Sequence, residues 1–405
     1  MASRARSHRT VRHVPRSAKV TRPRALIVVE HPVQHFSEGF RILQKSEAVD
    51  LSVLYWESDE RGRMDPDFGM PITWDVDLRS GYAWDVVGGS STPRRAINAV
   101  QHMMECSPDV IVVFGWASMI ARVALCWAVA TRTPIVLFGD STWQFEASGR
   151  HARRYARRWL LRVLMAAASG AISTGGFNRE FYIGHGMDPR RIAAGVCPTD
   201  VAACAAQPRD RTYRSRGEGG TGRPVCIGFA GKLIGRKGVD ELLRAAGRLA
   251  RDIPWSLRIV GDGPERDRLV DLSAELGIAD RVEFVGFRNT SEMPSEFSRC
   301  DIVVMPSTRE NRGLVAVEAM ASGAAVVVSS NTGVWGPGDV LKDGVTGFVY
   351  PSGDADALTH LLETLVRDPS LRTTIGLAAA ARVQDQGPDG FATGIERAVA
   401  MVCGA

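Results

Sequence analysis

Short apolar runs alternate with helix-length amphipathic segments through the second half of the chain. Five runs follow Arg223, at Val225–Phe229, Leu257–Val260, Val282–Val285, Ile302–Met305 and Ala325–Val328. Between them, apolar residues recur at helical spacing near Val239–Ala250, Glu265–Leu276, Glu292–Phe297 and Gly313–Ala321. Fully apolar strands separated by helices are typical of a parallel sheet covered on both faces. The pattern therefore predicts a doubly wound α/β domain over residues 223–380.

The first half repeats this alternation less regularly, over residues 24–206. Its predicted strands are Ala25–Val29, Leu51–Tyr55, Val110–Phe114, Ile135–Phe138 and Ala171–Ser173, and its predicted helices are Glu38–Lys45, Met119–Ala130, Arg153–Ala168 and Asn178–Gly184. Residues 207–222 contain four glycines and no aliphatic side chain, which is typical of a linker. Two Rossmann-like domains would leave a ligand crevice where the carboxyl ends of both sheets face each other. Residues 381–405 are expected to pack back towards the first domain.

Composition narrows the class of protein. Of the 405 residues, 45% are apolar and 23% are charged, which is ordinary for a soluble protein. No apolar run reaches the ~18 residues of a membrane span. Seven cysteines without a C-x-x-C spacing argue against a zinc knuckle or a disulfide framework and for a reducing cytoplasm. The Arg- and Ala-rich composition suggests a GC-rich bacterial genome.

The net charge of +5 comes from the amino end of the chain. Residues 1–22 hold seven Lys or Arg and no acid, so the remainder is nearly neutral. We expect residues 1–23 to be a disordered basic tail, or the product of an upstream start codon. An arm for nucleic acid or an anionic surface is the alternative. Nothing in the remainder points to nucleic acid as a partner.

A glycine-rich turn follows the first predicted strand of the second domain. It holds Lys232 and Lys237, two of only five lysines in the chain. The helix after such a turn offers free N–H groups and the positive end of its dipole to an anion. A compact ammonium also suits a phosphate oxygen. The turn is either a phosphate site or a glycine-rich connection with solvated cations.

A second pattern follows the predicted strand at Ile302–Met305. Glu310 lies in the loop, and Gly313 begins a helix whose first N–H groups lack intrahelical partners. Glu318 follows eight residues after Glu310, inside an otherwise apolar helix where an isolated carboxylate would be costly. Sugar or ribose hydroxyls would supply hydrogen-bond donors. A salt bridge to a Lys or Arg of the protein is the alternative.

Taken in order, these motifs resemble the family 4 retaining glycosyltransferases of the GT-B fold. The resemblance covers residues 223–370 and rests on Gly231-Lys232-x₄-Lys237-Gly238, Gly261-Asp262-Gly263-Pro264, Val285-Gly286-Phe287, Ser307-x-x-Glu310-x₇-Glu318 and the segment from Gly344 to Val349. The segment from Phe181 to Ile192 is also similar. The resemblance implies metal-independent transfer of a hexose-type sugar, with retained anomeric configuration, from a nucleoside diphosphate sugar. We expect a UDP-sugar, which is a co-substrate, so no cofactor and no metal are implied.

The resemblance also implies roles for individual residues. Lys232 and Lys237 would hold the diphosphate, Glu318 would bind the ribose hydroxyls, and Glu310 would orient the transferred sugar. The nucleotide site would further include Gly231 and the backbone N–H groups of Gly313, Leu314 and Val315. Cations and a helix dipole would then stabilise the leaving-group charge.

Two positions depart from the family pattern. The usual Glu-Gly-Phe-Gly-Leu loop here reads Glu310-Asn311-Arg312-Gly313-Leu314, so Arg312 either meets an anionic donor sugar or points into water. In the first domain, Asp140 stands where many members carry His after a strand. It would act at the catalytic centre by contacting a sugar, or it would cap the next helix.

The turn after the first strand carries the candidates for the acceptor site, His31, Gln34 and His35. The resemblance places the acceptor side there. Two histidines four residues apart are also spaced as metal ligands, but no third ligand is apparent. A turn histidine bonded to the backbone is a further alternative.

The segment Arg150–Arg162 forms a basic stripe at helical spacing, with apolar residues elsewhere round the helix. Such a helix either lies on an anionic membrane, which would suit a lipid-linked acceptor, or is a solvated face over a core-packed helix.

The sequence thus predicts a cytoplasmic hexosyltransferase, peripheral at the inner membrane face if the Arg stripe binds lipid. Its acceptor would be a glycan, a lipid-linked sugar or a secondary metabolite. The alternatives are a UDP-sugar epimerase on the same fold and a non-catalytic nucleotide-sugar-binding protein.

Overall fold

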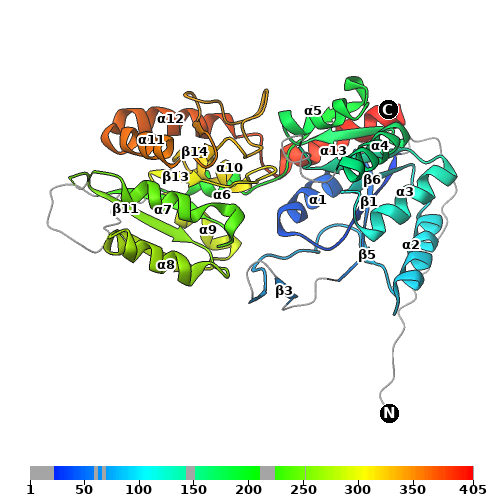
Figure 1. The fold of residues 1–405 in the computed structure, drawn as a ribbon. Helices are drawn as coiled ribbons and strands as arrows, with labels where there is room; N and C mark the ends of the chain where they lie inside the picture. Colours follow the sequence, from blue (N-terminus) through cyan, green and yellow to red (C-terminus); the bar gives the residue numbers. More distant parts are fainter. Residues whose placement is uncertain are drawn as a thin grey trace, which may run out of the picture.

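The computed structural model describes residues 22–58, 63–65, 70–142, 151–209, 224–250 and 252–404. Two α/β domains, each built on a parallel sheet, make up this part of the chain (Figure 1). The basic tail expected over residues 1–23 lies outside the described residues except for its last two. Most of the linker expected over 207–222 lies outside them as well.

The first domain holds a seven-stranded sheet in which all neighbouring strands are parallel, in the order β5-β2-β1-β6-β7-β8-β9. Its strands are β1 (Arg24–Val29), β2 (Asp50–Tyr55), β5 (Trp84–Val86), β6 (Val110–Phe114), β7 (Ile135–Gly139), β8 (Gly170–Ser173) and β9 (Ile192–Ala194). Its helices are α1 (Gln34–Ser46), α2 (Thr92–Cys106), α3 (Met119–Thr131), α4 (His151–Ala167) and α5 (Gly176–Gly184), with a 3₁₀ turn η2 at Pro189–Arg191. A separate antiparallel pair, β3 (Arg63–Asp65) and β4 (Met70–Ile72), lies outside the sheet.

The second domain holds a six-stranded parallel sheet in the order β12-β11-β10-β13-β14-β15. Its strands are β10 (Val225–Ala230), β11 (Trp255–Val260), β12 (Val282–Gly286), β13 (Ile302–Met305), β14 (Ala325–Ser329) and β15 (Phe348–Tyr350). Its helices are α7 (Val239–Gly247), α8 (Arg266–Glu275), α9 (Met293–Arg299), α10 (Leu314–Ala321), α11 (Ala355–Arg367) and α12 (Pro369–Arg382), with 3₁₀ turns η3 (Gly235–Lys237), η4 (Ala279–Arg281) and η5 (Thr290–Glu292). The strand order reverses between β10 and β13, and ligands of doubly wound sheets bind at the carboxyl ends of such strands.

The apolar runs are continuous because both faces of each sheet are covered. Ile27 and Val112 in the first sheet, and Ile227 and Val327 in the second, have no exposed surface. Each sheet separates two apolar clusters, one on each face. The predicted doubly wound α/β architecture of both halves is confirmed, and every strand predicted from an apolar run is present. The three-residue strands β5, β9 and β15 were not predicted, because so short a strand gives no readable alternation.

The chain crosses between the domains twice, and Thr199 at the first crossing and Gln386 at the second are buried. Helix α6 (Val201–Ala206) follows the first crossing and packs against α9 and α10 of the second domain, so this crossing precedes residues 207–222. Helix α13 (Pro388–Cys403) follows the second crossing and packs against α1, β8 and β9 of the first domain. The backbone N–H of Thr199 donates to the carbonyl of Gln386 at 3.2 Å, which holds the two crossings side by side.

A buried ion pair joins the second domain to the first at these crossings. Arg312 Nη1 lies 2.6 Å from Asp339 Oδ1, and the two side chains are 6% and 1% exposed. Arg312 Nη2 donates to Gln386 Oε1 at 3.1 Å. Asp339 Oδ2 also accepts a hydrogen bond, at 3.1 Å, from the N–H of Gly176 in the first turn of α5. Both expectations for Arg312 are wrong, because its guanidinium neither points into water nor remains available to an anionic sugar.

We predict that Asp339→Ala lowers the free energy of unfolding by ~3–5 kcal/mol, because it leaves the Arg312 guanidinium buried without its counterion. Denaturation in urea measures the loss. Asp356→Ala is the control, because Asp356 pairs with Arg248 at the surface and is 89% exposed. Its removal should cost less than ~1 kcal/mol. Equal losses in the two variants would contradict a structural role for the buried pair.

Candidate functional site

A cavity of about 180 Å³ lies between the two domains, at the carboxyl ends of β10 and β11. The first domain contributes Gln34, His35 and Trp74 to its wall. The second domain contributes the ends of both strands, the loop after β12 and the first turns of α9 and α10. This is the position at which a doubly wound sheet binds ligands. Five of the twelve candidate residues line it, namely Gln34, His35, Gly231, Val315 and Glu318.

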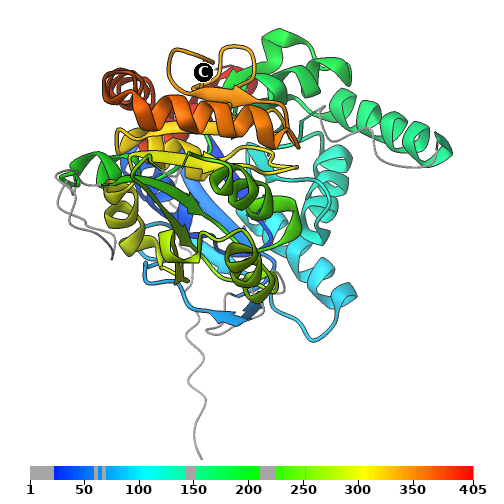
Figure 2. The same ribbon diagram turned by 60° about the vertical axis from the view of Figure 1, so that its left-hand side comes forward.

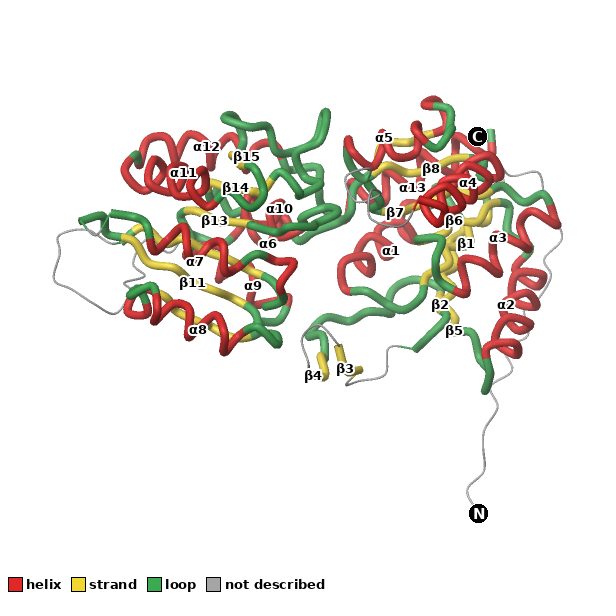
Figure 3. Tube along the Cα trace, in the orientation of Figure 1, coloured by secondary structure: helices red, strands yellow, loops and turns green. Residues whose placement is uncertain are grey.

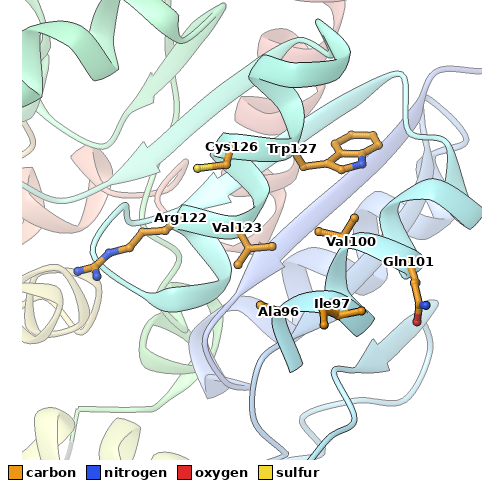
Figure 4. A pocket seen from close by; sticks show the side chains of 8 residues that line it. All are labelled: Ala96, Ile97, Val100, Gln101, Arg122, Val123, Cys126 and Trp127. Atoms are coloured by element: carbon orange, nitrogen blue, oxygen red, sulfur yellow. The ribbon is translucent and has the colours of Figure 1, made fainter. Parts of the chain in front are cut away.

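A larger hollow of about 590 Å³ lies on the outer face of the first domain, between α2 and α3 (Figure 4). Its lining includes Ile97, Val100, Val123 and Trp127 and contains no carboxylate and no histidine. It lacks the acids, bases and glycine-rich turns that chemistry on a phosphorylated ligand requires. We therefore place the candidate active site at the smaller cavity.

The glycine-rich turn after β10 brings a cation next to this cavity. Gly231 lines the cavity with a backbone φ of +151°, and a Cβ at this position would lie 3.9 Å from Lys237 Cε. Lys237 forms an ion pair with Glu310, and their side chains are only 16% and 18% exposed. Lys232 is partly buried in the same turn. The cation expected on a diphosphate and the carboxylate expected on a sugar therefore neutralise each other in this structure.

The loop that carries Glu310 is held by the strand-like segment after β14. The N–H of Glu310 donates to the carbonyl of Asn331 at 3.0 Å, and its own carbonyl accepts from the N–H of Gly333 at 2.8 Å. Gly313 then turns the chain into α10 with φ +76°, a conformation that favours glycine. The first turn of α10, including Leu314 and Val315, follows directly, and Val315 lines the cavity.

Glu318 lines the cavity from α10 and is partly exposed to it. Its carboxyl accepts a hydrogen bond from the backbone N–H of Asp200, but burial and the nearby Asp200 carboxylate raise its pKa to about 8. The alternative of a salt bridge to Lys or Arg is not what the structure shows. Asp200 itself caps α6 through a hydrogen bond from the N–H of Ala203 at 3.1 Å. Two carboxyl groups thus share one end of the cavity.

Two of the three acceptor-side candidates line the same cavity. Gln34 and His35 line it, and Gln34 Nε2 lies 3.4 Å from His35 Nε2. Burial lowers the pKa of His35 to about 4, so this imidazole is neutral at neutral pH. His31 does not line the cavity, and its buried Nδ1 has no hydrogen-bond partner within the described residues. Those residues contain no group of three or more side chains suited to a metal ion.

Asp140 lies apart from this cavity wall, at the carboxyl end of β7. Its side chain is exposed, and its charge helps to raise the pKa of the Tyr182 hydroxyl and of the Cys197 thiol, although burial of both groups is the larger cause. The alternative role as cap of the next helix stays a prediction, because residues 143–150 lie outside the described residues. Contact with a sugar stays a prediction for Asp140.

Helix α4 projects from the first domain (Figure 2) and carries the predicted basic stripe. The side chains of Arg150, Arg153 and Arg154 lie outside the described residues, and Arg157 and Arg162 are exposed. The helix packs through Leu161 and Met165, whereas Tyr155, Trp159 and Leu160 are 71%, 67% and 61% exposed. Large apolar side chains therefore share the outer surface with the arginines. No helix in the described ranges is long and apolar enough to span a bilayer.

The second domain is similar to a known protein family, and parts of the chain are similar to curated sequences. Residues 214–382 match the family of glycosyl transferases group 1. An uncharacterised glycosyltransferase of Methanocaldococcus jannaschii is 37% identical over 36% of this chain and 37% of its own length. A GDP-mannose-dependent alpha-(1-6)-phosphatidylinositol monomannoside mannosyltransferase of Mycolicibacterium smegmatis is 36% identical over 42% of this chain and 46% of its own length. The chain thus spans less than half the length of each of these two relatives.

Solved structures match nearly the whole chain. The structure of Anabaena HepE in complex with UDP and glucose superposes with a TM-score of 0.68, over 93% of this chain and 98% of that one, at 20% identity. The fold is therefore the predicted GT-B fold, two Rossmann-like domains that face each other.

Asp200 and Trp74 are among the cavity residues that sequence reasoning missed. The pattern Thr199-Asp200 before an apolar segment is a typical helix start, so α6 and its cap could have been predicted. Trp74 lies in a loop region with no periodic pattern, and no sequence signal connects it with the second domain.

We predict that the protein loses stability between about pH 4.5 and about pH 8 because of Glu318. Its pKa in the folded protein, about 8, lies above the ordinary value of 4.5, so the folded state binds the proton more tightly than the unfolded state. The resulting stabilisation is complete below pH ~4.5 and is lost as pH rises towards ~8, with each pKa unit worth ~1.4 kcal/mol. Thermal unfolding across this range measures it. Glu318→Gln should flatten that part of the profile, and an unchanged slope in this variant would refute the assignment.

Proposed function

We propose that the protein is a retaining glycosyltransferase that moves a hexose-type sugar from a UDP-sugar to an acceptor held mainly by the first domain. The observation that carries this proposal is that Glu318 and Gly231 line one cavity at the switch point of the second sheet, while the Lys237–Glu310 ion pair lies next to Gly231. Gln34 and His35 of the first domain complete the same cavity, which leaves an acceptor-side wall next to the donor groups.

The Lys237–Glu310 pair suggests how the donor enters. A diphosphate at the turn after β10 would accept hydrogen bonds from the Lys237 ammonium. This would weaken the ion pair between Lys237 and Glu310. The Glu310 carboxylate would then accept hydrogen bonds from the hydroxyls of the sugar. Lys237, Lys232 and the N-terminal end of α10 would stabilise the negative charge that develops on the leaving diphosphate.

The names of the relatives support a nucleoside diphosphate hexose as donor. The mycobacterial relative is named for GDP-mannose, and the HepE structure contains UDP and glucose. The choice of UDP and of retained configuration rests on the resemblance of the motifs to family 4. On the acceptor side, the neutral His35 would act as a hydrogen-bonding group rather than as a cation, because burial keeps it unprotonated.

We predict that the protein releases UDP from a UDP-hexose in the presence of acceptor, and that Glu310→Gln lowers turnover by about two orders of magnitude, as loss of a charge-stabilising group does. Lys237→Ala should weaken UDP binding by ~1.5–3 kcal/mol, because a charge-assisted hydrogen bond is lost. Coupled detection of UDP measures turnover and calorimetry measures binding. Lys342→Ala, which removes an exposed lysine of the same domain, is the control.

The same assay separates the alternatives. Formation of a new epimer without release of UDP would show that the protein is an epimerase and not a transferase. UDP binding without turnover of any UDP- or GDP-sugar, in the presence of sugar acceptors, would favour a non-catalytic nucleotide-sugar-binding protein.

We also propose that α4 contacts the anionic cytoplasmic face of a membrane, near a lipid-linked or membrane-bound acceptor. Trp159 and Leu160 are exposed where a core-packed helix would bury them, Arg157 and Arg162 lie beside them, and the helix contains no acid. Apolar side chains would enter the interface while the arginines meet lipid phosphates.

Vesicle co-sedimentation tests this contact. The protein should bind vesicles rich in phosphatidylglycerol more strongly than phosphatidylcholine vesicles, and binding should weaken with salt. Trp159→Ala should reduce it by about a factor of five or more, since the interfacial apolar area is lost. Met104→Ala removes a comparably exposed apolar side chain from α2 and should change nothing. Equal binding by both variants would refute the role of α4.

A further inference from the structure

A loop of the first domain reaches the second domain beside the cavity. Asn289 Nδ2 donates to the carbonyl of Thr73 at 2.8 Å. The Asp75 carboxylate accepts hydrogen bonds from the hydroxyl of Ser291 and, at 3.3 Å, from its backbone N–H. Figure 3 shows this loop running from β4 along the side of the first domain that faces the second. We call these contacts of Thr73 and Asp75 with Asn289 and Ser291 the clasp.

The second-domain side of the clasp is a rigid anchor. Asn289 caps η5 in a capping box, in which its side chain accepts from the turn and Glu292 bonds back to the N–H of Asn289. Because η5 runs directly into α9, the clasp attaches the first-domain loop to an element that itself lines the cavity.

Trp74 lies in the sequence between Thr73 and Asp75, the first-domain residues of the clasp, and it lines the cavity. The cavity is also lined by Val260, Phe287 and Met293 of the second domain. The carboxyl groups lie on α6 and α10, at Asp200 and Glu318, and the Lys237–Glu310 pair adjoins Gly231. The cavity therefore offers an apolar, aromatic surface in addition to its charged groups.

A nucleoside diphosphate has parts that match these surfaces. Its phosphates fit the turn with Lys237, and its ribose hydroxyls fit Glu318. Its heterocyclic base needs an apolar wall with an aromatic face, because base–aromatic stacking is favourable for every base. We propose that Trp74 forms one wall of the nucleobase subsite and that the clasp holds it there. The inference rests on the proposed function, since it assigns a part of the same nucleotide site to the first domain.

Calorimetry on the full-length chain tests the inference with UDP, GDP and inorganic pyrophosphate as ligands. Trp74→Ala should weaken binding of UDP and GDP about tenfold or more, the range of one lost stacking contact. Trp74→Phe keeps an aromatic face and should stay within about threefold of the unaltered protein. Pyrophosphate has no base, so its affinity should be the same in all three proteins.

Two further variants complete the design. Asp75→Ala removes the Ser291 contacts of the clasp, keeps the Asn289–Thr73 hydrogen bond and Trp74, and should weaken UDP binding by a smaller factor than Trp74→Ala. Trp84→Ala is the matched control, because Trp84 is a first-domain tryptophan that is 42% exposed and does not line the cavity. It should bind UDP as the unaltered protein does.

The outcomes separate this inference from the proposed function. Unchanged UDP affinity in Trp74→Ala, with a clear loss in Lys237→Ala, would overturn the nucleobase role and leave the transferase proposal intact. An equal loss of pyrophosphate affinity in Trp74→Ala would also overturn it, because the variant would then act on the whole site. No binding of UDP or GDP by the unaltered protein would overturn both proposals.

Discussion

The buried pair of Arg312 and Asp339 is the interaction on which the arrangement of the site depends. Arg312 belongs to the loop that carries Glu310, and Asp339 belongs to the segment after β14 whose backbone also holds that loop. Asp339 reaches the first turn of α5 in the first domain, and Arg312 reaches Gln386 at the second crossing. The ion pair therefore fixes the loop that carries Glu310 against the neighbouring segment, and its hydrogen bonds to Gly176 and Gln386 relate the two domains. Removing either partner would leave a buried charge, which is why such a contact enforces one geometry.

Close packing around this pair also favours one arrangement of the two domains. A Cβ at Gly176 would lie 2.1 Å from the carbonyl oxygen of Pro337, so the α5 terminus and the segment after β14 approach closely only because this residue is glycine. Beside them, Phe177 and Trp335 pack edge to face with ring centroids 5.2 Å apart. Contacts that fix backbone against backbone leave little room for sliding at this end of the interface.

The sequence predicted the elements and their class well, because continuous apolar runs report sheets buried on both faces. The resemblance of its motifs to a known family also implied that Gly231, Val315 and Glu318 share one site, and all three line the cavity. What it could not predict were contacts between residues far apart in the chain. Arg312 was expected to meet water or ligand because its partner, Asp339, lies in a loop with no periodicity. The pairing of Lys237 with Glu310, 73 residues apart, is likewise visible only in the fold.

The two ends of the interdomain contact differ in what it would cost to separate them. At the Arg312 end, separation would break the hydrogen bonds of Asp339 with Gly176 and of Arg312 with Gln386, and it would expose two charges that are almost fully buried. At the clasp, Asp75 and Ser291 are exposed, so water can replace their hydrogen bonds at little net cost. A motion of one domain relative to the other therefore has its lowest cost when it pivots near Asp339 and opens at the clasp. Such a motion would carry Trp74 away from the second domain. Glu310 and Gly313 would keep their positions within the second domain, so the loop that carries Glu310 would keep its conformation.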